Sequence, residues 1–162
     1  MLEIKRAKLQ NYQEIDKILV EIHNYHYEKF PSHFKKINSF LSFEKFQAIL
    51  TEETIEIIIG EEENKVVGIC LIKIIQIEET ELIHSRKSIL IENLGVTEEY
   101  RNRGIASKFL GEVDKIAKQK NINHIQLQVW GFNERAIKLY KKNKYQNRTQ
   151  ILQKNLNFSR LK

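Results

Sequence analysis

The segment from residue 87 to residue 110 constrains the fold more than any other part of this chain. Residues 88–96 begin with an apolar run that has the length and branched side chains of a buried strand. A polar stretch follows and ends near Gly104, after which apolar residues recur at helical spacing. These are Ile105, Phe109, Val113, Ile116 and Ala117. The pattern predicts a buried strand, a loop and an amphipathic helix in direct succession.

The start of this helix is predicted to bind an anion. Its first N–H groups have no acceptor within the helix, and the helix dipole adds partial positive charge, so phosphate or pyrophosphate is the natural ligand. Gly104 leaves the main chain accessible, and Arg101 and Arg103 add charge nearby. The alternative is an ordinary solvated loop with both arginines directed at water, because short glycine motifs recur by chance. The P-loop and the three-glycine dinucleotide pattern are both absent from the sequence.

Composition predicts one globular domain over residues 1–162, since 41% hydrophobic content at this length suits a single core. No apolar run has the length of a signal core or a membrane span, so we expect a cytoplasmic protein without membrane contact. Cys70 is the only cysteine, which excludes an internal disulfide, and its apolar surroundings predict a small buried side chain. The net charge is +6, but glutamates interrupt the basic residues along the chain. This distribution suits a small polyanionic ligand better than nucleic acid.

The remaining sequence predicts alternating strands and helices in one mixed sheet with helices on both faces. Strands are expected at residues 2–7, 54–60, 65–77, 88–96, 125–129 and 149–156. Two helices are expected at residues 12–27 and 101–120. Two further helices are expected to begin after N-cap residues, Ser42 and Asn133. The strands at 88–96 and 125–129 flank a helix, and such crossovers make the two strands parallel.

Two motifs in this order resemble the GNAT superfamily of acetyl-CoA-dependent N-acetyltransferases. The first is Leu94-Gly95-Val96 followed by Arg101-Asn102-Arg103-Gly104-Ile105-Ala106, which is similar to the family's Arg/Gln-x-x-Gly-x-Gly/Ala signature. The second runs from Val129 through Asn133 and Ala136 to Tyr140. The resemblance implies an α/β (α+β) fold with about six to seven strands, about four helices and a splayed parallel strand pair.

The resemblance also implies that acetyl-CoA is the co-substrate and that no metal is needed. It further implies how acetyl-CoA is bound. The main chain around Leu94 and Val96 would pair with the pantetheine arm, and Gly95 would permit a bulge there. The amides of the first motif would hold the pyrophosphate, and Asn133, with Ala136 in the same motif, would contact the pantetheine amide region. Without the resemblance, Asn133 is interpreted as a simple helix cap and Tyr140 as a core aromatic.

Acetyl transfer to an amine requires proton transfers, because an alkylammonium has a pKa of about 10.4. Counting by twos along the strand places Glu92 on the face of Leu94, so we assign it as general base, directly or through water. In the alternative interpretation, Glu92 is a carboxylate that pairs with a neighbouring basic residue or is exposed at the end of the strand. Tyr140 is the candidate acid for the departing thiolate, and amides near Leu94 and Val96 would polarise the thioester carbonyl.

The segment with clustered rings between the first two predicted helices resembles the family's variable region beside the acceptor. We assign His26, Tyr27 and Phe34 to the acceptor pocket, with Trp130 as a further wall or as simple packing. Metal binding is disfavoured because the histidines lack a partner cysteine or a zincin motif. Lys144 occupies a position where many relatives carry glycine, which predicts either a different turn or some backbone strain.

The function predicted from the sequence is acetylation of a primary amine on a small molecule or protein. A non-catalytic acyl-CoA sensor is the main alternative, and a basic nucleic-acid-binding protein is a second one, testable by salt-dependent retention. The resemblance also allows a homodimer through an edge strand or the terminal segment.

Overall fold

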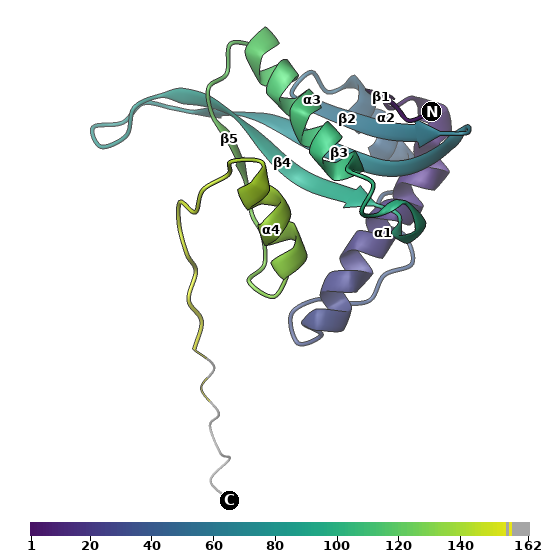
Figure 1. The fold of residues 1–162 in the computed structure, drawn as a ribbon. Coiled ribbons are helices and arrows are strands. Elements are labelled where there is room, and N and C mark those ends of the chain that lie inside the picture. The colour runs from purple at the N-terminus through teal and green to yellow at the C-terminus, as the bar shows by residue number, and fades with distance from the viewer. Residues whose placement is uncertain (155, 157–162) are drawn as a thin grey trace, which may run out of the picture.

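A single five-stranded sheet organises the computed structural model, which describes residues 1–154 and 156 (Figure 1). Its strands lie side by side in chain order: β1 (Glu3–Arg6), β2 (Ile55–Glu62), β3 (Lys65–Ile77), β4 (Arg86–Val96) and β5 (Ile125–Leu127). Every neighbouring pair is antiparallel except β4 and β5, which are parallel. The predicted mixed sheet with a parallel pair at this position is therefore confirmed.

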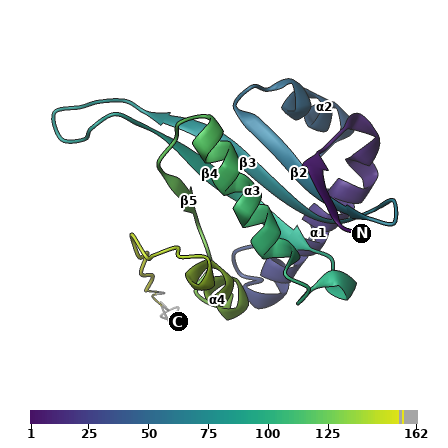
Figure 2. The ribbon, with the colours of Figure 1, turned by 45° about the horizontal axis from the view of Figure 1, so that its top comes forward.

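Within the described residues, four α-helices cover the two faces of the sheet (Figures 1 and 2). They are α1 (Tyr12–Lys29), α2 (Phe43–Thr51), α3 (Ile105–Gln119) and α4 (Glu134–Lys142), and short 3-10 turns lie at Leu9–Asn11 and Glu98–Tyr100. One buried cluster joins α3 to the sheet, and a second joins α1 and α2 to the opposite face. The apolar stripe predicted for residues 101–120 forms the first cluster, although the helix itself begins only at Ile105.

The strand predicted at residues 149–156 is not present where the structure describes it. Residues 149–154 and 156 do not belong to a strand, and position 155 lies outside the described residues. Ile151 and Leu152 are 89% and 90% exposed, so the apolar alternation of this segment has no sheet face to cover. A strand requires a partner for its main-chain groups as well as a suitable pattern, and the described sheet has five strands rather than six or seven.

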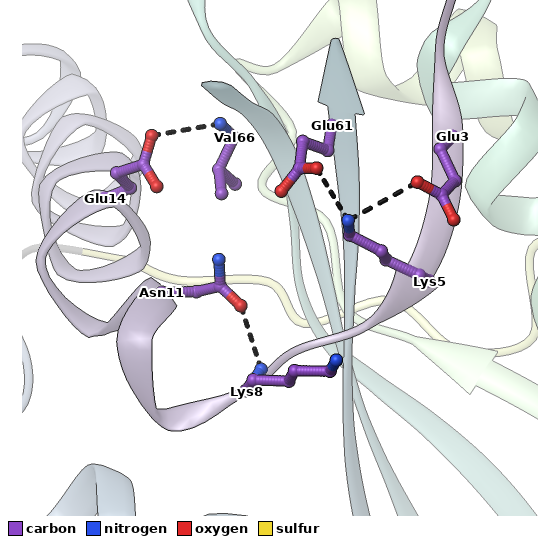
Figure 3. Close-up of polar contacts among 7 residues, drawn as sticks. All are labelled: Glu3, Lys5, Lys8, Asn11, Glu14, Glu61 and Val66. Atoms are coloured by element: carbon purple, nitrogen blue, oxygen red, sulfur yellow. Dashed lines mark hydrogen bonds and ion pairs between the residues drawn. The ribbon is translucent and has the colours of Figure 1, made fainter. Parts of the chain in front are cut away.

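Polar contacts join the start of α1 to the sheet and the strands β1 and β2 to each other (Figure 3). Glu14 Oε1 accepts a hydrogen bond from the buried Val66 amide at 3.0 Å, which joins α1 to the first residues of β3. Lys5 Nζ lies 2.6 Å from Glu61 Oε1, and this hydrogen bond raises the pKa of Lys5. The sequence predicted the helix and all three strands but not these contacts between them.

The local signals for caps and turns agree with the structure. Ser42 Oγ accepts from the Lys45 amide at 3.3 Å, as expected for an N-cap. The hairpin between β2 and β3 turns through Glu63 and Asn64, which both have positive φ angles, as two-residue hairpin turns require. Within the described part of the chain, no helix has the length and apolar content needed to cross a membrane.

Candidate active site

The parallel strands β4 and β5 separate at one end of the sheet. They pair over three positions only, from Ile89 opposite Ile125 to Ile91 opposite Leu127, and β4 then continues to Val96. Beyond Ile91, β4 has β3 on one side and no strand on the other (Figure 1). An extended ligand can therefore pair with the free edge of β4 as an added strand.

The bulge that accompanies this separation lies at Glu92 rather than at Gly95. Leu71 of β3 is opposite Asn93 and the next residue, Ile72, is opposite Ile91, which leaves Glu92 as the extra residue. Ile91 and Leu94 consequently pack in the same cluster beneath α3, although they are three positions apart. The count by twos from Glu92 to Leu94 does not hold across this segment, because the bulge interrupts the alternation. Glu92 itself is exposed at the bulge and has no ion pair with any described residue.

Gly95 is required by packing against α1. A Cβ at this position would lie 2.3 Å from Cδ1 and 2.7 Å from Cγ1 of Ile22. Leu94 and Val96, on either side of it, pack toward α3. Cys70 lies opposite Leu94 on β3 and is fully buried, as predicted, and burial raises the pKa of its thiol to about 12, so it is not a thiolate nucleophile.

The loop before α3 presents main-chain amides that donate to no protein group among the described residues. Gly104, at a φ of +77°, is the N-cap, and a Cβ there would meet no atom within 4 Å. In the described part of the chain, the amides from Asn102 through Ala106 have no main-chain acceptor, whereas the Arg101 amide donates to Glu98. The Ile105 side chain is buried in the core, so only its main chain faces the loop. This cluster of unpaired donors at a helix start fits a diphosphate.

Both arginines of the loop contact protein groups. Arg101 donates from Nε to the Val96 carbonyl at 2.9 Å and pairs with Glu21 of α1. Arg103 Nη1 lies 3.7 Å from Glu62 Oε2, and Arg103 Cζ lies 4.7 Å from the centroid of the Tyr100 ring. Both arginines therefore shape the loop.

A third arginine, which the sequence reasoning did not consider, also reaches the loop. Arg135 Nη2 donates to Asn102 Oδ1 at 3.2 Å. Arg135 lies inside the Asn133–Tyr140 motif, and this position is the feature of the sequence that could have identified it.

Helix α4 brings Asn133, Ala136 and Tyr140 to the same side of the sheet as α3. Asn133 Oδ1 accepts a hydrogen bond from the Ala136 amide at 3.1 Å, so Asn133 is the N-cap of α4, as predicted. Tyr140 packs against the α3 cluster, and burial raises its pKa to about 12. The ring centroid of Tyr140 lies 5.7 Å from that of Tyr145. Lys144, the residue before Tyr145, has a φ of +67°, so the backbone strain predicted at this position is present.

Three of the four residues assigned to the acceptor pocket belong to one group of contacting rings. The ring of His26 lies 5.6 Å from that of Phe34, which lies 5.1 Å from Trp130. Phe132 stacks on Trp130 at 5.9 Å and was not among the predicted residues. Tyr27 has no ring contact with any described residue. Burial lowers the pKa of His26, which keeps its imidazole neutral near pH 7.

The ring group is held in place by the loop after α1. Asn24 exchanges two hydrogen bonds with the main chain of Ile37, and Asp16 accepts from the amides of Phe40 and Leu41. These contacts bring the loop back along α1 and place its rings against the segment after β5. No three potential metal ligands gather among the residues that the structure describes.

Comparison with known proteins finds one matching family profile and several relatives of similar sequence. A family profile described as "Acetyltransferase (GNAT) family" matches residues 19–145. The thialysine N-epsilon-acetyltransferase of Bos taurus is 38% identical over 55 residues, which are 34% of this chain and 32% of that relative. The chain thus covers about a third of the length of this relative.

Solved structures share the fold over almost the whole chain. A mutant of the BH1408 protein from Bacillus halodurans has a TM-score of 0.92 at 24% identity, covering 96% of this chain and 99% of that one. A predicted acetyltransferase with acetyl-CoA from Clostridium acetobutylicum has a TM-score of 0.67 at 21% identity, with 96% of both chains covered. At these identities the likeness shows the fold alone.

Proposed function

Because the chain belongs to the acetyltransferase (GNAT) family, we propose that it transfers the acetyl group of acetyl-CoA to a primary amine. The acceptor is a small molecule or a protein, and the amine attacks the thioester directly. The observation that carries this proposal is the free edge of β4 beside a loop of unpaired amides. Together they offer one surface for an extended amide-containing arm and another for its diphosphate.

The cofactor fits these two surfaces by its own chemistry. Its pantetheine arm carries amides that pair with the main chain around Leu94, and its diphosphate accepts from the amides of residues 102–106. The Val96 carbonyl already accepts from Arg101, so the pairing is assigned to the strand before it. Asn133 keeps its side-chain NH₂ free while its oxygen caps α4, and that group is the proposed donor to the pantetheine region.

The residues around the splay supply the proton transfers. Glu92, exposed and without an ion pair in the described chain, accepts the proton of the attacking amine directly or through water. The new C–N bond forms as the C–S bond breaks, and the Tyr140 hydroxyl donates its proton to the departing thiolate. Main-chain amides near Leu94 and Val96 polarise the carbonyl.

The acceptor approaches across the ring group formed by His26, Phe34 and Trp130, with Tyr27 nearby in α1. Aromatic faces attract alkylammonium groups and bury the apolar part of an amine. The name of the bovine relative, which records an N-epsilon acetylation, supports an amine acceptor here.

The test is an amine panel of amino acids, polyamines, aminoglycosides and peptide N-termini, with thiol release measured in the presence of acetyl-CoA. We expect amine-dependent release of CoA for at least one class of amine. Tight binding of acetyl-CoA with no release across the panel would favour the non-catalytic sensor instead.

A further inference from the structure

We propose that the amine acceptor is a monoamine that carries an aromatic ring on a short aliphatic linker. The inference rests on the proposed function and names the class of amine that the acceptor surface selects. That surface is the ring group, which also includes Tyr25, Phe30 and His33. Trp130 lies at its centre, with ring centroids 5.7 Å from Phe30, 5.1 Å from His33 and 5.1 Å from Phe34.

The ring group is a surface rather than a part of the buried core. None of its members is fully buried, and Trp130 is 37% exposed. The loop after α1 that carries three of the rings is held by two hydrogen bonds between Asn24 and the main chain of Ile37. Exposed apolar patches of this kind mark binding surfaces, and rings that are already fixed in place lose little freedom when a ligand binds.

The geometry of the rings favours an aryl group over an aliphatic one. Trp130 and Phe132 are stacked with an interplanar angle of 17°, whereas Phe34 meets Trp130 edge-on at 74°. The group therefore offers both faces and edges, which are the two surfaces that an incoming aromatic ring pairs with. The same faces attract the ammonium group of an amine as it approaches.

The charges along the segments that carry the rings disfavour an acceptor with several ammonium groups. Residues 25–36 and 130–135 contain two carboxylates, Glu28 and Glu134, and four cations, Lys29, Lys35, Lys36 and Arg135. On α1 toward β4, Glu21 is already paired with Arg101. A molecule with several positive charges is attracted by an excess of carboxylates and repelled by a surface of this sign. The acceptor that fits carries a single ammonium.

The position of the ring group sets the length of the linker. Ile22 of α1 packs directly against Gly95 of β4, next to Leu94, where the proposed function places the thioester. His26 follows Ile22 by four residues, about 6 Å along the helix, and its ring lies 5.9 Å from that of Phe132. The C-terminal end of α1 and the loop before α4 lie at the same end of the molecule in both views (Figures 1 and 2). An amine at β4 and an aryl group on the rings are thus joined by about two to three carbons.

The test measures thiol release from acetyl-CoA with 2-phenylethylamine, butylamine and spermidine. The first two are primary monoamines that differ in the aromatic ring, and spermidine is a polyamine. The key variant is Phe34→Leu, which keeps an apolar side chain and removes one ring of the group. The control is Phe43→Leu, the same change at an exposed ring that contacts Tyr12 at the start of α1 and α2. Thermal melting and calorimetry with acetyl-CoA show that each variant is folded and binds the co-substrate.

We expect kcat/KM for 2-phenylethylamine to exceed that for butylamine and for spermidine by about tenfold or more, as burial of an aryl group against rings predicts. Phe34→Leu lowers kcat/KM for 2-phenylethylamine by about fivefold or more and leaves that for butylamine nearly unchanged, and Phe43→Leu changes neither. A structural defect would lower both values together.

A preference for spermidine, equal values for the two monoamines, or equal losses for both in Phe34→Leu would overturn this inference and leave the proposed function standing. If neither these amines nor the wider panel releases CoA, the proposed function fails and this inference fails with it.

Discussion

Tyr140 is the residue whose side chain the proposed chemistry uses most directly. Replacing it with phenylalanine keeps the ring in the α3 cluster and removes only the hydroxyl. We expect Tyr140→Phe to lower kcat by roughly 10²–10⁴-fold, the range for a lost proton donor. Calorimetry should give an acetyl-CoA affinity close to that of the unmodified chain. Unchanged turnover would remove Tyr140 from the mechanism.

The pH dependence of turnover checks the same role. The phenol donates in its protonated form, and burial raises its pKa to about 12, so it remains competent well above the range of an ordinary tyrosine. A profile of kcat against pH should therefore show no descending limb from this group near pH 10, where a free tyrosine titrates. A decline there that disappears in Tyr140→Phe would show that the hydroxyl is not buried as described.

Gly95 tests the contact between β4 and α1. A methyl group at this position would overlap Ile22, so Gly95→Ala should destabilise the fold by about 1–3 kcal/mol, as overpacking does. Gly111→Ala in α3 is the matched control, because a Cβ there meets nothing and alanine favours a helix by about 0.5–1 kcal/mol. Thermal or urea unfolding measures both changes.

A second substitution identifies the cause of the Gly95 effect. Ile22→Ala removes both atoms that the new methyl group would meet, so the double variant should regain part of the stability lost by Gly95→Ala. The contact would be disproved if Gly95→Ala melted at the temperature of the unmodified chain.

At the scale of elements, Glu14 determines how α1 begins against the sheet. Its carboxylate is the acceptor for the buried amide of Val66 (Figure 3). Glu14→Ala leaves that amide without its partner and should lower the free energy of unfolding by about 1–3 kcal/mol. Glu14→Gln retains an acceptor oxygen and serves as the control. Equal losses for the two variants in urea unfolding would mean that the hydrogen bond is not the cause.

The sequence predicted most elements because their signals are local. The period of the apolar residues identified β3 at its observed bounds, and Ser42 and Asn133 marked the two helix starts that they cap. The face of Glu92 could not be predicted, because the bulge arises from pairing with β3 and leaves no mark in the alternation of β4 alone. The segment at 149–154 shows the same limit, since its strand-like alternation is not accompanied by a strand in the structure.

At the scale of the molecule, the candidate site is a product of unequal strand lengths. β5 ends at Leu127 while β4 continues to Val96, and α3 begins immediately after the loop at the end of β4. The motifs predicted that this loop and α4 would serve one ligand. The resemblance assigned His26, Phe34 and Trp130 to one pocket, and these rings do meet in the fold. Phe132 was not predicted as a member of the ring group, because its contacts with the other rings arise only in the fold.

The central claim is that acetyl-CoA occupies the opening between β4 and β5. A crystal structure of the chain with CoA tests it most directly. The account predicts continuous density along the free edge of β4 near Leu94, with the diphosphate within hydrogen-bond distance of the amides of residues 102–106. Density for the ligand at another surface, with this edge and these amides still unoccupied, would contradict it.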